Sequence, residues 1–158
     1  MSQEAAARTF FNAPYFAVVG ASSDPRKFGH KIFNWYTTHS LPATPINPSA
    51  PTITALSPPP SKNQEYDTLP CLSKLPHPKD TSVSIITPPH VTIKVLQEAK
   101  ELGIQGVWLQ PGTFDDEVLK FARDGFKAAV GGDGGGGSEG WCVLVDGEQA
   151  LEGRSPKL

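Results

Sequence analysis

An apolar run that ends abruptly in small residues constrains the fold of this chain more than any other feature. Phe16-Ala17-Val18-Val19 is followed by Gly20-Ala21-Ser22-Ser23, and a helical pattern begins at Lys27. A continuous apolar run is typical of a buried parallel strand, and a small-residue turn after it lets backbone N–H groups approach a phosphate at the next helix start. The run therefore indicates a phosphate-binding turn, and the same residues also fit a tight turn that binds nothing.

Length and charge favour one domain that binds a small molecule. The chain has 158 residues and a net charge of -2, which gives no sign of a nucleic-acid surface. Its two cysteines, Cys71 and Cys142, lie far apart and outside any metal-ligand spacing, which predicts a reducing compartment and no metal. No apolar run reaches membrane-spanning length, and Met1 to Arg8 lacks a signal-peptide core. We therefore expect a cytoplasmic protein.

Apolar runs alternate with helical patterns along the chain. Strands are expected over 15–20, 44–46, 82–86, 106–110 and 126–130, and helices over 28–39, from the prolines at 88–89 to Leu102, and from a cap at Thr113 to Gly125. The stripe of the second helix, Val91, Val95, Leu96, Ala99 and Leu102, is expected to be buried. This alternation predicts the α/β class: a doubly wound, Rossmann-like parallel sheet of about five strands with helices on both faces.

Two segments interrupt this pattern within the single domain expected over 1–158. Residues 51–64 are rich in proline, serine and threonine and are expected to form a surface insertion with no core of its own. Residues 131–140 hold a glycine tract that fits a flexible linker or a mobile lid. After the tract, a short strand is expected over 141–145 and a turn or helix over 147–151.

Ligands of such sheets bind beyond the carboxyl ends of the strands. A dinucleotide site would show G-x-G-x-x-G after the first strand and an acid after the second, to bind the ribose hydroxyls. Here Gly20 is followed by Ala-Ser-Ser, and Asn47 stands in place of the acid. These two positions count against a dehydrogenase.

Four motifs in order resemble those of the small stand-alone CoA-binding proteins. They are V-V-G-A-S at 18–22, P-I-N-P at 45–48, I-T-P-P at 86–89 and W-L-Q-P-G at 108–112. That family consists of single Rossmann-like domains similar to the CoA-binding domain of the succinyl-CoA synthetase α subunit. The match runs from about residue 15 to residue 130. The resemblance implies binding of coenzyme A or an acyl-CoA by a carrier, sensor or subunit that has no catalysis of its own.

The resemblance also implies a set of site residues. The pyrophosphate would lie against Gly20, Ala21, Ser22 and Ser23, near Arg26 and Lys27, although these two cations also fit a solvated loop. The adenosine would lie beside Asn47 and Pro48. The pantetheine arm would cross Ile86, Thr87, Pro88 and Pro89 toward Gln110 and Gly112, and the two prolines also suit a helix start. Cys142 resembles a family cysteine that could contact the CoA thiol, and its apolar neighbours also fit ordinary packing.

No arrangement of nucleophile, base and orienting group is evident in the sequence. The four histidines, His30, His39, His77 and His90, fit surface or capping positions. A rival hypothesis is a nucleotide- or NAD(P)-dependent enzyme that uses the same crevice, with chemistry supplied by His90 or Cys142. A protein partner or a homo-oligomer is compatible with either hypothesis.

Overall fold

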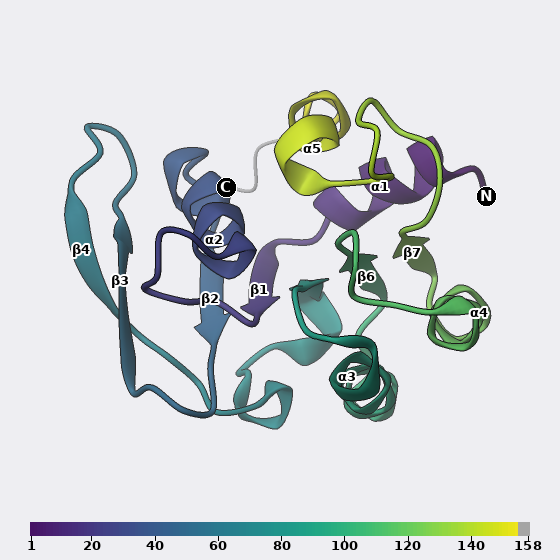
Figure 1. Cartoon of the computed structure of the whole chain (residues 1–158), viewed down its shortest axis with the longest axis horizontal. Helices are drawn as coiled ribbons and strands as arrows, with labels where there is room; N and C mark the ends of the chain where they lie inside the picture. Colours follow the sequence, from purple (N-terminus) through teal and green to yellow (C-terminus); the bar gives the residue numbers. More distant parts are fainter. Residues whose placement is uncertain (155–158) are drawn as a thin grey trace.

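The centre of the molecule is a five-stranded parallel sheet with the order β2-β1-β5-β6-β7. The computed structural model describes residues 1–154. The strands are β1 (Tyr15–Val19), β2 (Ala43–Ile46), β5 (Thr81–Ile85), β6 (Gly106–Leu109) and β7 (Ala128–Val130) (Figure 1). Every pairing between them is parallel, and β1 contacts β2 on one side and β5 on the other. The predicted doubly wound, Rossmann-like sheet is therefore confirmed.

Helices cover both faces of the sheet, as expected. On one face α3 (Pro89–Glu101) and α4 (Asp116–Gly125) pack against the apolar residues of one cluster, which includes Val83, Ile85 and Leu109. On the other face α1 (Gln3–Phe11), α2 (Phe28–Thr38) and α5 (Val143–Leu151) enclose a second cluster, which includes Phe16, Val18 and Trp108 (Figure 1). Successive side chains of a strand point to opposite faces, so each strand contributes to both cores.

The N-terminal helix α1 was missed by the sequence analysis. Ser2 caps it by accepting a hydrogen bond from the Ala5 N–H at 3.1 Å. Phe10 and Phe11 are fully buried at its end, against the rings of Phe16 and Trp108. These aromatic contacts make α1 part of the main core.

The proline-rich segment expected as a surface insertion with no core of its own contains a β-hairpin, which packs against the main core. Strands β3 (Thr52–Leu56) and β4 (Asn63–Asp67) pair antiparallel. Side chains in β3 alternate between exposed and buried, which places Ile53 and Ala55 in the cluster beside α2. The hairpin thus adds to the core on the face of the sheet that α1, α2 and α5 cover.

The segment after β7 also differs from expectation. Residues predicted as a strand over 141–145 instead begin α5, because Asp146 accepts hydrogen bonds from the N–H groups of Cys142 and Gly136. The Trp141 N–H donates to Gly132 O, so the glycine tract is bonded at both of its ends. A smaller correction concerns α4, where Asp115 rather than Thr113 caps the helix by accepting from the Val118 N–H.

Replacing Ile53 by alanine tests whether the hairpin belongs to the core. Ile53 is 2% exposed, so Ile53→Ala should lower the free energy of unfolding by about 2–5 kcal/mol. Urea denaturation would measure this change. The neighbouring Thr54 is exposed, and Thr54→Ala serves as the control with a change below about 0.5 kcal/mol. Equal midpoints for the two variants would show that the hairpin packs against nothing.

Candidate functional site

Backbone contacts between glycines shape the turn from β1 to α2. Gly20 has a φ of 96°, and a Cβ there would overlap the carbonyl oxygen of Ile86. A Cβ at Gly29 in α2 would overlap the carbonyl oxygen of Gly20. Both positions therefore require glycine, which lets α2 begin directly against the ends of β1 and β5. The role of Gly29 was not recognised in the sequence, although a glycine nine residues after Gly20 is visible there.

Hydrogen bonds hold the rest of this turn in place. Ser22 Oγ accepts from the Asp24 N–H, and Ser23 Oγ accepts from the Thr54 N–H of the hairpin at 2.9 Å. Each hydroxyl still carries an O–H of its own for donation. Arg26 forms an ion pair with Asp24 at 3.0 Å, with 87% of the arginine side chain exposed, and its guanidinium lowers the pKa of that carboxyl. Arg26 thus forms a solvent-exposed ion pair in the loop, which was the alternative to a position near the phosphates.

Asn47 ties this turn to the segment after β2. Its Nδ2 donates to the carbonyl oxygen of Ala21 at 3.0 Å. Its Oδ1 accepts from the N–H groups of Ser49 and Ala50 at 2.8 and 3.1 Å. Both ends of the amide are therefore engaged within the protein.

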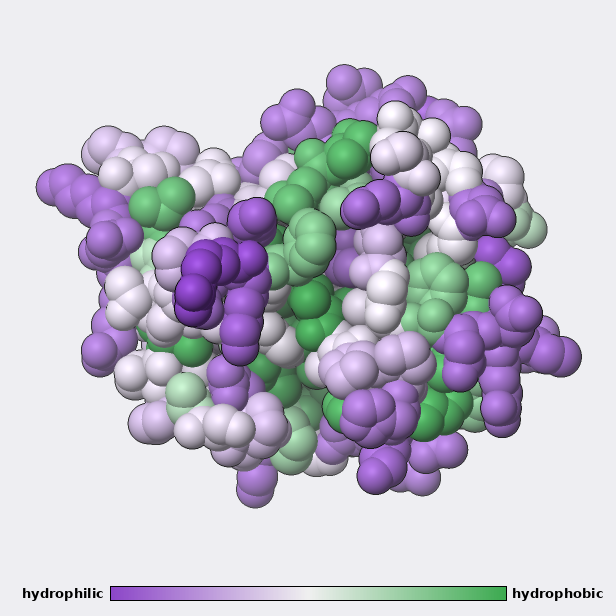
Figure 2. All heavy atoms as spheres, viewed as in Figure 1, coloured by the Kyte–Doolittle hydropathy of each residue, from purple (hydrophilic) through white to green (hydrophobic). Residues whose placement is uncertain are grey.

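A cavity of about 450 Å³ opens at the carboxyl ends of β1 and β2, and we call it the carboxyl-edge cavity. Its floor is the end of β1, and α3 forms one side. In Figure 2, apolar atoms lie in a recess near the centre of the view, between the regions that α2 and α3 occupy in Figure 1. Its lining residues are Val19, Gly20, Ala21, Ile46, Asn47, Pro48, Pro70, Cys71, Leu72, Thr87, Val91, Lys94, Val95 and Glu98.

The structure brings five of the predicted site residues together in this wall: Gly20, Ala21, Asn47, Pro48 and Thr87. Those that are not among its lining residues are Ser22, Ser23, Arg26, Lys27, Ile86, Pro88, Pro89, Gln110, Gly112 and Cys142. Sequence reasoning did not assign to the site the 70–72 segment or the α3 residues of the wall. Val91 and Val95 were expected in the buried stripe, and they are half-buried in the wall instead.

Gln110 and Cys142 lie at the start of α5. Gln110 is 2% exposed, and its Oε1 accepts from the Val143 N–H at 3.0 Å. Cys142 is 9% exposed at the position before α5, and burial raises the pKa of its thiol. Both residues hold α5 in place. A contact between Cys142 and the thiol of CoA stays a prediction, and burial with a raised pKa counts against a reactive thiolate.

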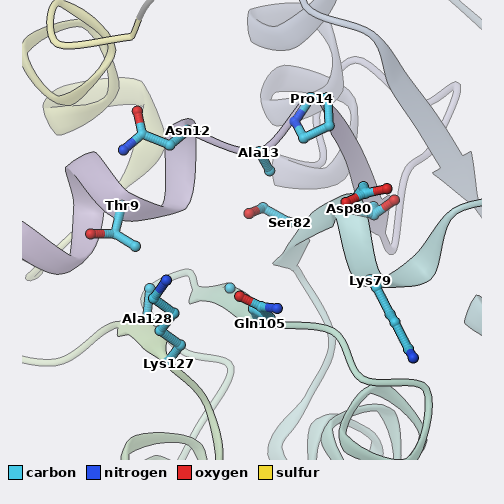
Figure 3. A pocket seen from close by; sticks show the side chains of 12 residues that line it. Thr9, Asn12, Ala13, Pro14, Lys79, Asp80, Ser82, Gln105, Lys127 and Ala128 are labelled. Carbon is cyan, nitrogen blue, oxygen red and sulfur yellow. The ribbon is translucent and has the colours of Figure 1, made fainter.

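A second cavity of about 270 Å³ lies at the opposite, amino-terminal edge of the sheet. It is polar, with Asn12, Lys79, Asp80, Gln105 and Lys127 among its lining residues. Figure 3 shows the Lys79 side chain extending away from the other labelled residues. The carboxyl-edge cavity is larger and includes Gly20 of the β1–α2 turn, and we therefore place the candidate site there.

No histidine lines the carboxyl-edge cavity, and His90 is exposed in the first turn of α3. Within residues 1–154, no three His, Cys, Asp or Glu side chains are grouped to hold a metal ion. The helices of that same range are too short or too polar to cross a membrane.

A family model described as a CoA binding domain matches residues 15–135. The chain belongs to this CoA-binding domain family. The match includes the β1–α2 turn and every lining residue of the carboxyl-edge cavity. No curated protein matches the chain significantly.

Solved structures similar to this CoA-binding domain support the same fold. A hypothetical protein from Pyrococcus horikoshii OT3 is 20% identical with a TM-score of 0.73, covering 96% of this chain and 93% of its own. A conserved hypothetical protein from Pyrococcus furiosus is 27% identical with a TM-score of 0.61, and the match covers 73% of this chain and 91% of that protein. A Thermus thermophilus structure named cell-free ID.343 is 23% identical with a TM-score of 0.65, covering 82% and 90%.

Two glycine substitutions separate steric overlap from backbone strain. Gly20 and Gly112 both have positive φ, but a Cβ at Gly112 would meet no atom within 4 Å. Gly112→Ala should therefore cost about 1–2 kcal/mol from its left-handed φ alone. Gly20→Ala should cost more, because the turn must also move away from Ile86 O. Thermal unfolding of both variants checks this order, which equal losses of stability would contradict.

Proposed function

We propose that this protein binds coenzyme A or an acyl-CoA in the carboxyl-edge cavity and has no catalysis of its own. The observation that carries the proposal is the position of the cavity beside the glycine turn at the end of β1. After β1 the chain forms β2 on one side of β1, and it then returns to form β5 on the other side. The order in which strands are added to the sheet therefore reverses at β1. Open α/β sheets bind ligands at such switch points.

The start of α2 supports a phosphate at this turn. Lys27 precedes the helix and makes no side-chain cap, and no acidic residue lies in the first turn. The first N–H groups of a helix lack intrahelical acceptors, and the helix dipole favours an anion there. A pyrophosphate placed at the β1–α2 turn would satisfy these donors.

The wall of the cavity suits the less polar parts of the ligand. Val19, Ile46, Leu72, Val91 and Val95 supply aliphatic surface around an opening of about 450 Å³. Pockets for cofactors are commonly of this size and mostly apolar, with a few polar groups that fix orientation. The adenosine of CoA fits this description beside Asn47 and Pro48.

The groups around the cavity fit a role in ligand binding without catalysis. Neither His90 nor Cys142 lines it, so the two residues that the rival hypothesis assigned to catalysis do not lie at the proposed ligand. A carrier, a sensor or a subunit of a larger assembly needs only the binding site. A cytoplasmic location and the extent of the domain over 1–158 stay predictions.

Filling the cavity should abolish binding. Val91 lines the wall from the first turns of α3, and Val91→Trp would place an indole in the space proposed for the ligand. We expect at least tenfold weaker CoA binding by isothermal titration calorimetry. Gln97 is exposed on the same helix and does not line the cavity, so Gln97→Trp is the matched control. If a folded Val91→Trp variant binds CoA like Gln97→Trp, the ligand lies elsewhere.

NAD should bind less tightly than CoA. The acid that usually accepts hydrogen bonds from the ribose diol is replaced by Asn47, whose amide is engaged with Ala21, Ser49 and Ala50. An unpaired hydroxyl pair costs about 1–3 kcal/mol, which corresponds to at least about fivefold in affinity. Asn47→Asp should not restore NAD binding. An aspartate cannot donate a hydrogen bond to Ala21 O, and the loss of that bond should weaken the turn. Equal calorimetric affinities for NAD and CoA would contradict this assignment.

A further inference from the structure

Lys94 supplies the only positive charge among the residues that line the carboxyl-edge cavity. It lies in the second turn of α3, and its side chain is exposed at the cavity. Among residues 1–154, no ion pair includes Lys94. Its ammonium group is therefore available to a ligand in the cavity.

The acidic residue of the wall forms no ion pair with Lys94. Glu98 is one helical turn away, but its Oε2 accepts from Ser73 Oγ at 2.6 Å and from the Ser73 N–H. Its Oε1 accepts from the Leu72 N–H at 3.3 Å. A lysine that precedes a glutamate by four residues is also the less favourable order for an ion pair within a helix. Glu98 thus fixes the 72–74 turn and leaves Lys94 without a partner.

Two cations were expected near the phosphates, Arg26 and Lys27, and Lys27 is not among the lining residues of the cavity. Arg26 is paired with Asp24 and does not line the cavity. The phosphate site proposed at the β1–α2 turn would use backbone N–H groups. For a second, separate anion on a ligand in the cavity, Lys94 is the one cationic side chain among the lining residues.

We infer that Lys94 determines specificity for a ligand whose adenosine end carries a phosphate monoester. Coenzyme A has such a group on its ribose, whereas dephospho-CoA and NAD do not. This inference rests on the proposed function, because it concerns the same cavity. A monoester is close to dianionic at neutral pH and forms strong charge-assisted hydrogen bonds with an ammonium group.

The test compares two ligands and three proteins by isothermal titration calorimetry. The unmodified protein should bind CoA about tenfold more tightly than dephospho-CoA. Lys94→Gln should remove this difference by weakening CoA alone. Lys100→Gln is the matched control, because Lys100 is exposed on α3, lies near the Phe121 ring and does not line the cavity. The preference for CoA should also decrease with added salt.

The outcomes separate the two proposals. Equal binding of CoA and dephospho-CoA by the unmodified protein would overturn the role of Lys94 and leave the CoA site intact. A Lys94→Gln variant that loses affinity for both ligands equally, or for neither, would overturn it as well. If the unmodified protein binds neither ligand, the proposed function fails and the inference fails with it.

Discussion

The backbone contact between Gly20 and Gly29 is the constraint on which the site depends. A side chain at Gly29 would occupy the position of Gly20 O, and one at Gly20 would occupy the position of Ile86 O. Main-chain atoms of three segments therefore meet here: the end of β1, the start of α2 and the residue after β5. This close approach packs the start of α2 against Gly20 and Ala21, two residues that line the cavity.

Side chains from distant segments keep that arrangement rigid. Asn47 joins the turn to the chain after β2, Ser23 joins it to the hairpin, and Glu98 joins α3 to the 72–74 turn. Each bond connects a different pair of segments at the carboxyl edge. Internal hydrogen bonds thus connect the segments around the cavity, and preorganisation of this kind reduces the entropy cost of binding.

The central sheet could be predicted because its strands are buried on both faces. Tyr15–Val19 and Thr81–Ile85 have continuous or nearly continuous burial, and their sequences are correspondingly apolar or β-branched. Gly103, which follows the helix predicted to end at Leu102, has a φ of 79°, as a left-handed cap requires. The hairpin was missed because prolines and hydroxyl residues obscured the alternation in β3. The strand expected over 141–145 was wrong because two side chains hold the start of α5. Asp146 accepts from the N–H of Cys142, four residues earlier, and Gln110 accepts from the Val143 N–H across a tertiary contact.

Only the part of the candidate site that follows the strands could be predicted from local sequence patterns. Residues that follow β1, β2 and β5 can be located from strand patterns, and five of them line the cavity: Gly20, Ala21, Asn47, Pro48 and Thr87. Cys71 and Leu72 reach the wall because the 70–72 segment folds back against α3, which no local pattern indicates. Val91 and Val95 have the spacing of a buried helical stripe, and apolar spacing cannot distinguish a core from the wall of a cavity.

The two faces of the sheet differ at the carboxyl edge. On the α5 side, Gln110 and Asp146 bind the start of the helix, and the glycine tract is bonded through Gly136. On the α3 side, the half-buried Val91 and Val95 leave the end of β1 open. Polar groups on this side, those of Asn47 and Glu98, bond the segments that line the cavity and leave it open. A ligand at the β1–α2 turn can therefore extend along α3 without displacing a bonded segment.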